Sequence, residues 1–346
     1  MQLRDVETEG WRRVVRVEDE TAGLLCFIAV HDATLGPGCG GVRVFPYADE
    51  DAALRDVKNL SRGMTYKNAL GGIPFGGGKA VIVADPRKDK TPAMFKAFGE
   101  ALNALEGLYY TAEDSGVTDE DLAVVRGVTP YAGGVAKDGV GGNPSPFTAR
   151  GVWRGIEAAA RARLGREDLN GASVSILGVG AVGMALAGHL HDAGARLVVA
   201  DVFDERVEEA AARFGAAPAT PAEAPGAAVD IYAPCALGGA IDAQTLGELR
   251  AGVVAGAANN QLATPDMDEG LRAKGVLYAP DFVINAAGVI SVGLEILGQW
   301  SADELNARID KIGDTLSEIF QRADAEGRAT GAVADDLALE IINRAR

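Results

Sequence analysis

The chain has 346 residues, of which 48% are hydrophobic, and a formal net charge of −16. This length predicts two domains with substantial cores. The negative charge argues against nucleic acid or an anionic membrane as a partner, because such binding needs clustered Lys and Arg. No apolar run is long enough to span a bilayer, and the N-terminus does not resemble a signal peptide. We therefore expect a cytoplasmic protein that acts on a small molecule.

The first half of the sequence alternates short apolar segments with amphipathic ones, which indicates a mixed α/β domain. The expected strands cover residues 24–33, 41–47, 79–84 and 108–114. The expected helices cover residues 49–70 and 91–107, the second capped by Thr91 with Pro92 at its first position. A glycine-rich loop is expected just before Lys79. A stretch rich in glycine and proline at residues 133–146 predicts a hinge or linker.

Beyond this stretch a long helix is expected over residues 144–165. Strand and helix segments then alternate regularly, which predicts a doubly wound parallel sheet of the Rossmann type. A final helix pair, opened by a capping box from Ser301 to Glu304, is expected to pack back toward the first domain. The predicted division is a first domain of residues 1–142, joined by the C-terminal helix at about 325–346, and a second domain of residues 143–324.

The second domain carries a dinucleotide-binding motif. An apolar strand segment runs into Gly178-x-Gly180-x-x-Gly183, with Ala181 and Val182 between the last two glycines. In this motif the first glycine permits the tight turn, the second lets the backbone approach a pyrophosphate, and the third allows close helix packing. A GxGxxG pattern is weak evidence alone, but the strand before it and the helix after it make it specific.

Asp201 ends the next apolar segment, 23 residues after Gly178. A carboxylate in this place bonds the adenosine ribose hydroxyls and repels a 2′-phosphate. We therefore expect NAD rather than NADP as the cofactor.

Two lysines are unusual in their surroundings. The chain has 9 lysines against 24 arginines, so most exposed cationic positions are arginine. Lys67 and Lys79 flank one glycine-rich segment, and Lys79 begins an apolar strand. Unlike arginine, a lysine can give up its proton in a protein, which makes these two candidates for catalysis. The three cysteines and three histidines are not spaced as metal ligands, so no metal site is expected.

Several longer motifs resemble the amino acid dehydrogenases of the glutamate, leucine, phenylalanine and valine group, most closely the leucine and phenylalanine branch. They occur in the family's order and span nearly the whole chain: LGPGCGGVRVFPY, RGMTYKNALGGIPFGGGKAVI, TAEDSGVT, GNPSPFTARGV, ILGVGAVG, DIYAPCALGG, VVAGAANNQL and LYAPDFVINAAGVI. The resemblance implies reversible, NAD-linked oxidative deamination of an L-amino acid to its 2-oxo acid and ammonia. It also implies a catalytic cleft between the two domains and a homo-oligomer.

The resemblance assigns roles to particular residues. Lys79 would be the general base and Asp114 would pass protons to and from the amino group. Lys67, helped by the backbone amides of Gly40 and Gly41, would hold the substrate α-carboxylate. The remaining assignments concern the second domain: Thr148 and Asn259 at the nicotinamide, Ala233 in the cofactor site, and Asn285 lining the cleft.

The side-chain pocket implied by the resemblance is apolar. Glutamate-specific members place a lysine before the glycine pair and a serine late in the INAAGV segment, where this chain has Cys39 and Val292. Together with Ala112 and Val289, these residues favour leucine, valine or isoleucine. Cys39 is smaller than the leucine usual in that position, so a phenylalanine dehydrogenase is an alternative.

Two further hypotheses differ in class. An inactive relative that binds NAD and an amino acid as a sensor or scaffold would not need Lys67, Lys79 and Asp114 together, and all three are present. A hydroxy-acid dehydrogenase would need a His and Arg pair, and none of the three histidines lies in a site motif.

Overall fold

The computed structural model describes residues 1–134, 143–236 and 238–346, and these form two compact units. Unit 1 contains residues 1–143, 289–305 and 338–346; unit 2 contains residues 144–288 and 306–337. The first boundary lies one residue from the expected one. Most of the predicted hinge at 133–146 lies outside the described residues.

The rest of the predicted division needs correction. Residues 289–305 belong to unit 1 rather than unit 2, and only residues 338–346, not 325–346, return to unit 1. The helices at these places are α10 (Ala287–Ile296), α11 (Ala302–Glu326) and α12 (Thr330–Arg344). Each of them starts in one unit and ends in the other. A helical sequence pattern marks an apolar face but does not identify the core against which that face packs.

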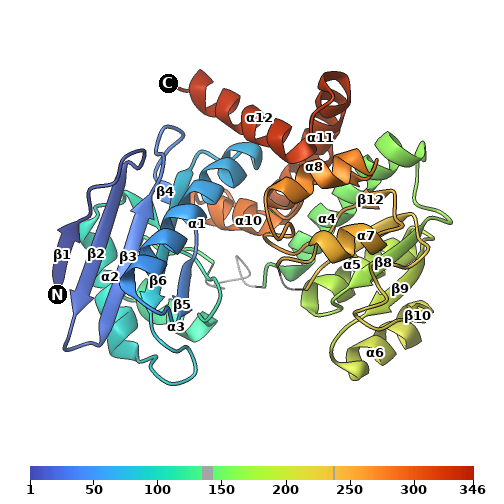
Figure 1. Ribbon diagram of the computed structural model, residues 1–346. Coiled ribbons are helices and arrows are strands. Elements are labelled where there is room, and N and C mark those ends of the chain that lie inside the picture. Colours follow the sequence, from blue (N-terminus) through green and yellow to red (C-terminus); the bar gives the residue numbers. More distant parts are fainter. Residues whose placement is uncertain (135–142, 237) are drawn as a thin grey trace. The chain divides into compact units, whose positions relative to one another are not determined.

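Unit 1 is built on a mixed seven-stranded sheet (Figure 1), in agreement with the predicted mixed α/β domain. Its strands are β1 (Gln2–Asp5), β2 (Arg13–Asp19), β3 (Leu24–Val30), β4 (Gly38–Cys39), β5 (Val42–Phe45), β6 (Gly76–Val83) and β7 (Tyr109–Tyr110). The order is β1-β2-β3-β6-β4-β7, and β5 also pairs with β6. Strand β6 is antiparallel to β3 and parallel to β4 and β5, so it is central.

Helices cover both faces of this sheet. Helix α1 (Glu50–Leu70) lies on one face, where its residues Ala53 and Val57 share a cluster with Phe27, Ala29 and Val81. Helix α2 (Pro92–Ala104) and helix α3 (Asp119–Arg126) lie on the other face, in a cluster with alternate strand residues such as Ile28 and Ile82. Because side chains alternate along a strand, the odd-numbered residues of β6 face α1.

The glycines before Lys79 form strand rather than the expected loop. Gly76, Gly77 and Gly78 are the first residues of β6. A Cβ atom on Gly77 would lie 2.0 Å from the Thr65 hydroxyl of α1, and one on Gly78 would lie 2.5 Å from the Tyr109 ring. Glycine is therefore needed here for close packing on both faces of the strand, which local turn chemistry does not reveal.

The helix caps agree with the sequence. The Thr91 hydroxyl accepts a hydrogen bond from the Met94 amide at 3.2 Å, and Pro92 is the first residue of α2. The Ser301 hydroxyl likewise accepts from the Glu304 amide at 3.2 Å at the start of α11. Both bonds satisfy donors that have no partner within their helix.

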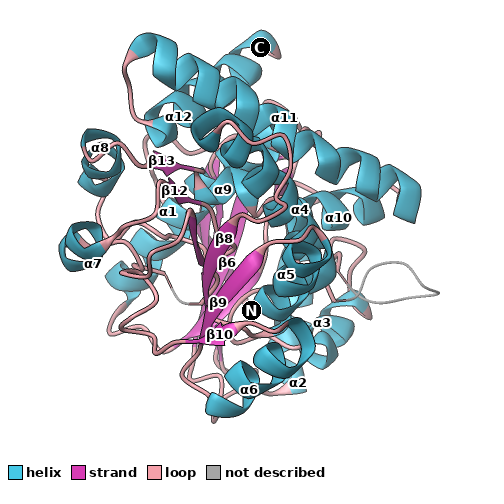
Figure 2. Cartoon of the chain, turned by 90° about the vertical axis from the view of Figure 1, so that its right-hand side faces the viewer, coloured by secondary structure: helices cyan, strands magenta, loops and turns pink. Residues whose placement is uncertain are grey.

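Unit 2 contains the predicted parallel sheet, which Figure 2 shows with helices on both faces. Its strands are β8 (Ser173–Leu177), β9 (Arg196–Ala200), β10 (Ala217–Pro218), β11 (Ile231–Pro234), β12 (Val253–Val254) and β13 (Leu277–Tyr278). The order β10-β9-β8-β11-β12-β13 is the 3-2-1-4-5-6 arrangement of dinucleotide-binding domains, and it confirms the Rossmann prediction.

The helices of unit 2 follow the strands in the expected alternation. They are α4 (Ser145–Ala159), α5 (Ala181–Asp192), α6 (Asp204–Phe214), α7 (Ala243–Glu248), α8 (Asp266–Ala273) and α9 (Asp281–Ile284). A π-helix (Ala160–Leu164) continues α4 to Gly165, so the helix expected over residues 144–165 is present.

Candidate active site

Lys79 occupies a buried position at the centre of unit 1. It lies in β6, is 6% exposed, and shares with Val81 the strand face that packs against α1. Its Nζ atom lies 2.5 Å from Asp114 Oδ2. A lysine and a carboxylate buried together form an ion pair that can exchange protons.

Asp114 follows β7, where Glu113 bridges to Val42 at the start of β5. Burial alone would raise its pKa, but the positive charges of Lys79 and Arg43 outweigh burial and lower the pKa to about 2. The Asp114 carboxyl is therefore ionised at neutral pH. A Cβ atom on Gly41 would lie 2.9 Å from the Asp114 Cβ, so Gly41 needs to be glycine for this approach.

The C-terminal end of α1, which carries Lys67, is fixed to the sheet by the next residue, Asn68. Asn68 donates hydrogen bonds to the carbonyl of Cys39 at 3.1 Å and to the carbonyl of Gly76 at 2.6 Å. Lys67 thus lies in the last turn of a helix held against β4 and β6, the strand that carries Lys79.

One expected role is not supported. The Gly40 amide donates to the carbonyl of Tyr110 at 3.2 Å within the β4–β7 pairing. An amide that is hydrogen-bonded in the sheet is not available to a substrate carboxylate. The Gly40 amide therefore does not belong to the candidate carboxylate site, whereas the Gly41 amide remains a candidate.

The apolar residues expected around the substrate side chain lie in unit 1. Val289 and Val292 belong to the part of α10 in this unit, and Ala112 is 7% exposed. A Cβ atom on Gly134 would lie 3.6 Å from Val292 and 3.9 Å from Ala112, so the structure brings these two residues to one place. Cys39 is fully buried, and burial raises the pKa of its thiol to about 12, which keeps it uncharged.

The sequence interpretation missed two groups of residues in this half. Gly133 and Gly134 pack against Val292 but were assigned to the hinge. Arg43 was quoted within a motif but given no role, although its Nη2 atom lies 3.4 Å from Asp114 Oδ2. An arginine inside an otherwise apolar strand segment was the available signal, because burial requires such a charge to have a partner.

The glycine motif of unit 2 has the geometry that a dinucleotide requires. Gly178 has φ +96°, and a Cβ atom on Gly183 would lie 1.9 Å from the Gly178 carbonyl oxygen. Gly180 instead faces open space, with only Arg206 Nη1 near its Cβ position, at 3.8 Å. Gly180 caps α5, whose first residues are Ala181 and Val182. A pyrophosphate fits here because the open glycine lies at the positive end of a helix.

Asp201 lies at the end of β9 beside this turn. Its Oδ2 atom accepts a hydrogen bond from the Val179 amide at 2.9 Å, and its Oδ1 atom accepts one from Phe203 at 3.1 Å. Arg206 Nη1 lies 3.7 Å from Asp201 Oδ1. The turn into α6 therefore brings a cation close to this carboxylate.

The remaining predicted residues of unit 2 lie in or after neighbouring elements. Asn285 donates from Nδ2 to Asn259 Oδ1 at 2.9 Å and to the carbonyl of Ala257 at 3.1 Å. Thr148 lies in α4, with its hydroxyl 3.6 Å from the Cβ position of Gly288. Ala233 is buried in β11 beside β8, so only its backbone can contribute to a cofactor site.

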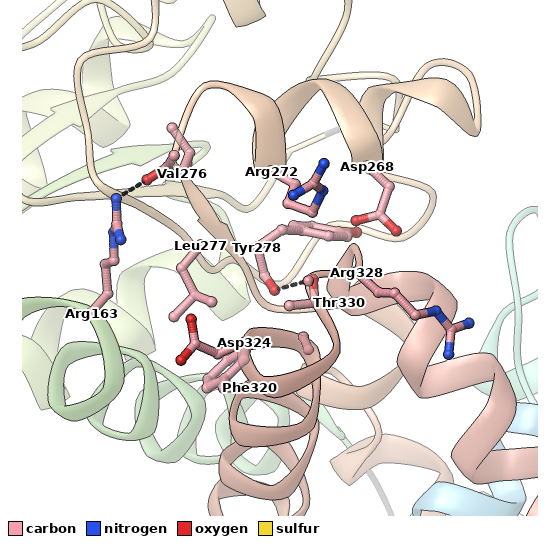
Figure 3. Close-up of a pocket in the computed structure, with 13 residues that line it drawn as sticks. Arg163, Asp268, Arg272, Val276, Leu277, Tyr278, Phe320, Asp324, Arg328 and Thr330 are labelled. Carbon is pink, nitrogen blue, oxygen red and sulfur yellow. Dashed lines mark hydrogen bonds between the residues drawn. The ribbon is translucent and has the colours of Figure 1, made fainter.

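Unit 2 also contains a cavity of about 240 Å³, which Figure 3 shows near β13. Residues before β8 and β13, such as Arg163 and Val276, line it, whereas ligands of such sheets bind at the carboxyl ends of the strands. Its arginines are already paired, for example Arg328 with Asp336 at 2.7 Å. We therefore do not assign the cofactor to this cavity.

The described part of the chain lacks two further features. No helix there is long and apolar enough to cross a membrane. No group of three or more His, Cys, Asp or Glu residues there is arranged to hold a metal ion.

A unit with a buried lysine–aspartate pair and a unit with a dinucleotide-binding sheet together define a two-domain dehydrogenase. Two family models match the chain: Glu/Leu/Phe/Val dehydrogenase, dimerisation domain, over residues 12–131, and Glutamate/Leucine/Phenylalanine/Valine dehydrogenase over residues 203–345. The chain therefore belongs to the Glu/Leu/Phe/Val dehydrogenase family. It is an amino acid dehydrogenase, an oxidoreductase of a family that uses a nicotinamide cofactor, which confirms the resemblance.

Individual relatives agree with this assignment. A leucine dehydrogenase from Geobacillus stearothermophilus is 44% identical over 342 residues, covering 99% of this chain and 93% of the relative. A valine dehydrogenase from Streptomyces virginiae is 43% identical over 341 residues, covering 97% of this chain and 95% of the relative. The crystal structure of L-tryptophan dehydrogenase from Nostoc punctiforme has a TM-score of 0.87 and 39% identity, covering 97% of both chains.

Proposed function

We propose that the protein catalyses the reversible, NAD-dependent oxidative deamination of an apolar L-amino acid, with leucine, valine and isoleucine favoured, to the 2-oxo acid and ammonia. The observation that carries this proposal is the buried pair of Lys79 and Asp114, with Nζ and Oδ2 2.5 Å apart. When bound, NAD accepts the hydride that leaves the substrate Cα.

The chain's own residues bind the substrate carboxylate and transfer protons. Lys67, with the Gly41 amide, holds the α-carboxylate. Lys79 first passes its own proton to Asp114, and its neutral amine then takes a proton from the water that attacks the substrate imine, while Asp114 carries protons to and from the amino group. The low pKa of Asp114 keeps its carboxyl group ionised at neutral pH.

The proposed residues of unit 2 hold the cofactor. The glycine turn and the start of α5 bind the pyrophosphate, and Asp201 bonds the adenosine ribose. Thr148 and Asn259 act at the nicotinamide end, and Asn285 contributes to substrate binding. We also propose a homo-oligomer, supported by the description of the first matching family model as a dimerisation domain.

A substrate panel tests the proposed function. Purified protein is mixed with NAD and single L-amino acids, and NADH absorbance is followed. We expect turnover with leucine, valine and isoleucine, and formation of the matching 2-oxo acid and ammonia. Reduction of NAD by hydroxy acids but not by amino acids would contradict the proposal.

Phenylalanine is the second candidate substrate, because Cys39 and Gly134 leave more room than larger residues would. We expect graded discrimination among leucine, valine, isoleucine and phenylalanine, since one methylene of pocket changes selectivity by about 1 to 3 kcal/mol. Cys39→Leu should reduce kcat/KM for phenylalanine more than for valine. An unchanged ratio of the two, or a preference for phenylalanine in the wild type, would contradict this assignment of the pocket.

We expect NAD to be preferred over NADP by at least about tenfold in kcat/KM, or about 1.4 kcal/mol, because Asp201 repels the 2′-phosphate. Asp201→Ser should reduce this preference for NAD. Arg206 partly offsets the negative charge of Asp201. Arg206→Ala should therefore increase the preference for NAD. The measurement is kcat/KM for each cofactor at saturating leucine, and equal use of the two by the wild type would show that Asp201 does not select the cofactor.

A further inference from the structure

A second group of charges surrounds the Lys79–Asp114 pair. Arg43 lies in β5 and uses its two terminal nitrogens on different carboxylates. Its Nη2 atom is 3.4 Å from Asp114 Oδ2, and its Nη1 atom donates to Asp56 Oδ2 at 3.1 Å. The Tyr47 hydroxyl donates to the same Asp56 oxygen at 2.5 Å.

The fold explains why these groups meet. Arg43 is paired in register with Val81 of β6, so its side chain shares the sheet face that packs against α1. Asp56 lies in α1, above that face, and Tyr47 follows β5. The contacts therefore connect the helix that carries Lys67, the strand beside Lys79, and the segment that carries Asp114.

Arg43 places one positive charge between two carboxylates. Asp114 and Asp56 are partly buried carboxylates, with side chains 20% and 30% exposed. Lys79 and Arg43 supply the two positive charges that face Asp114 from β6 and β5. Glu113 and Tyr109, on the Asp114 segment, also interact with it electrostatically. Without Arg43, Asp56 would lose its paired cation, and Asp114 would keep only Lys79 of these two cations.

Arg43 bridges Asp56 and Asp114, and these two contacts also fix the position of its guanidinium group. An arginine held by one carboxylate presents its second terminal nitrogen in a fixed direction, because the guanidinium is planar. Asp56, itself held by Tyr47, anchors Arg43 in this way. Lys79 and Arg43 both approach Asp114 Oδ2, so Arg43 holds this oxygen from a second direction.

We propose that Arg43 is a positioning residue for the reaction: anchored by Asp56 and Tyr47, it holds the Asp114 carboxylate in place beside Lys79. This inference rests on the proposed roles of Lys79 and Asp114. Arg43 acts through Asp114 and does not itself touch substrate.

Three variants test this inference, measured by kcat and KM for leucine and by thermal unfolding. Arg43→Gln removes the cation, and Asp56→Asn breaks the same ion pair while leaving the cation in place. Arg43→Gln should lower kcat by about 10- to 100-fold, the scale of misplacing a reacting group, with little change in the KM for leucine because Lys67 is intact. Asp56→Asn should also lower kcat, but by a smaller factor, because Arg43 loses its anchor and keeps its charge next to Asp114, and Arg43→Lys should recover part of the loss.

A double-mutant comparison separates the inference from the proposed function. In an Asp114→Asn background, Arg43→Gln should cause no further loss, because the group that it positions is already disabled. An additive loss there, a normal kcat in Arg43→Gln, or an unchanged kcat in Asp56→Asn would overturn the role of Arg43 and leave the proposed function standing. Full activity in Asp114→Asn itself would instead contradict the proposed function.

Discussion

Lys79→Ala is expected to lower kcat for leucine by about 10² to 10⁴, the usual effect of losing a general base. Lys79 lies in β6 of unit 1 and the glycine motif lies in unit 2, so NADH binding should survive. The measurements are steady-state kcat with leucine and NAD, and the NADH dissociation constant from fluorescence. A near-normal kcat in this variant would disprove the proposed mechanism.

Lys79→Arg is the matched control, because it keeps the positive charge next to Asp114 but cannot give up a proton. We expect it to be as inactive as Lys79→Ala. If it kept substantial activity, the role of Lys79 would be to hold Asp114 by charge and not to act as a base.

Lys67→Ala separates substrate binding from proton transfer. Its main effect should be a large rise in the KM for leucine, accompanied by slower turnover, because the α-carboxylate loses its cation. A variant with normal KM and only reduced kcat would place Lys67 outside the carboxylate site.

Glutamate is expected to be a very poor substrate, with kcat/KM at least about 100-fold below that of leucine. The residues proposed to surround the side chain, Cys39, Ala112, Val289 and Val292, carry no charge, so a second carboxylate would be buried without a partner. That costs several kcal/mol, and about 2.8 kcal/mol already corresponds to 100-fold.

Glutamine controls for size in this measurement, because it matches glutamate in length but is neutral. We expect kcat/KM for glutamine to lie between the values for leucine and glutamate. Cys39→Lys combined with Val292→Ser should raise glutamate use relative to leucine, since these residues stand there in glutamate-specific members of the family. Equal kcat/KM for glutamate and leucine in the wild type would show that the pocket is not formed by these residues.

The sequence by itself determined the class of each domain and most of its elements. The 3.6-residue period predicted α1, and the strand–glycine–helix pattern predicted the parallel sheet of unit 2 and its cofactor turn. These features are local: a turn that needs positive φ at Gly178, or a helix start capped by Thr91, depends on neighbouring residues. The motif order also predicted the family, which the comparisons confirm.

Only the tertiary structure decided which distant residues meet. It pairs Lys79 with Asp114, adds Arg43 and Asp56 to them, and brings Arg206 to Asp201. It also uses the Gly40 amide within the sheet and makes strand of the glycines before Lys79. The physical reason is that strand register and helix packing set these contacts, and both depend on residues far apart in the chain, whereas spacing in the sequence reports only on neighbours.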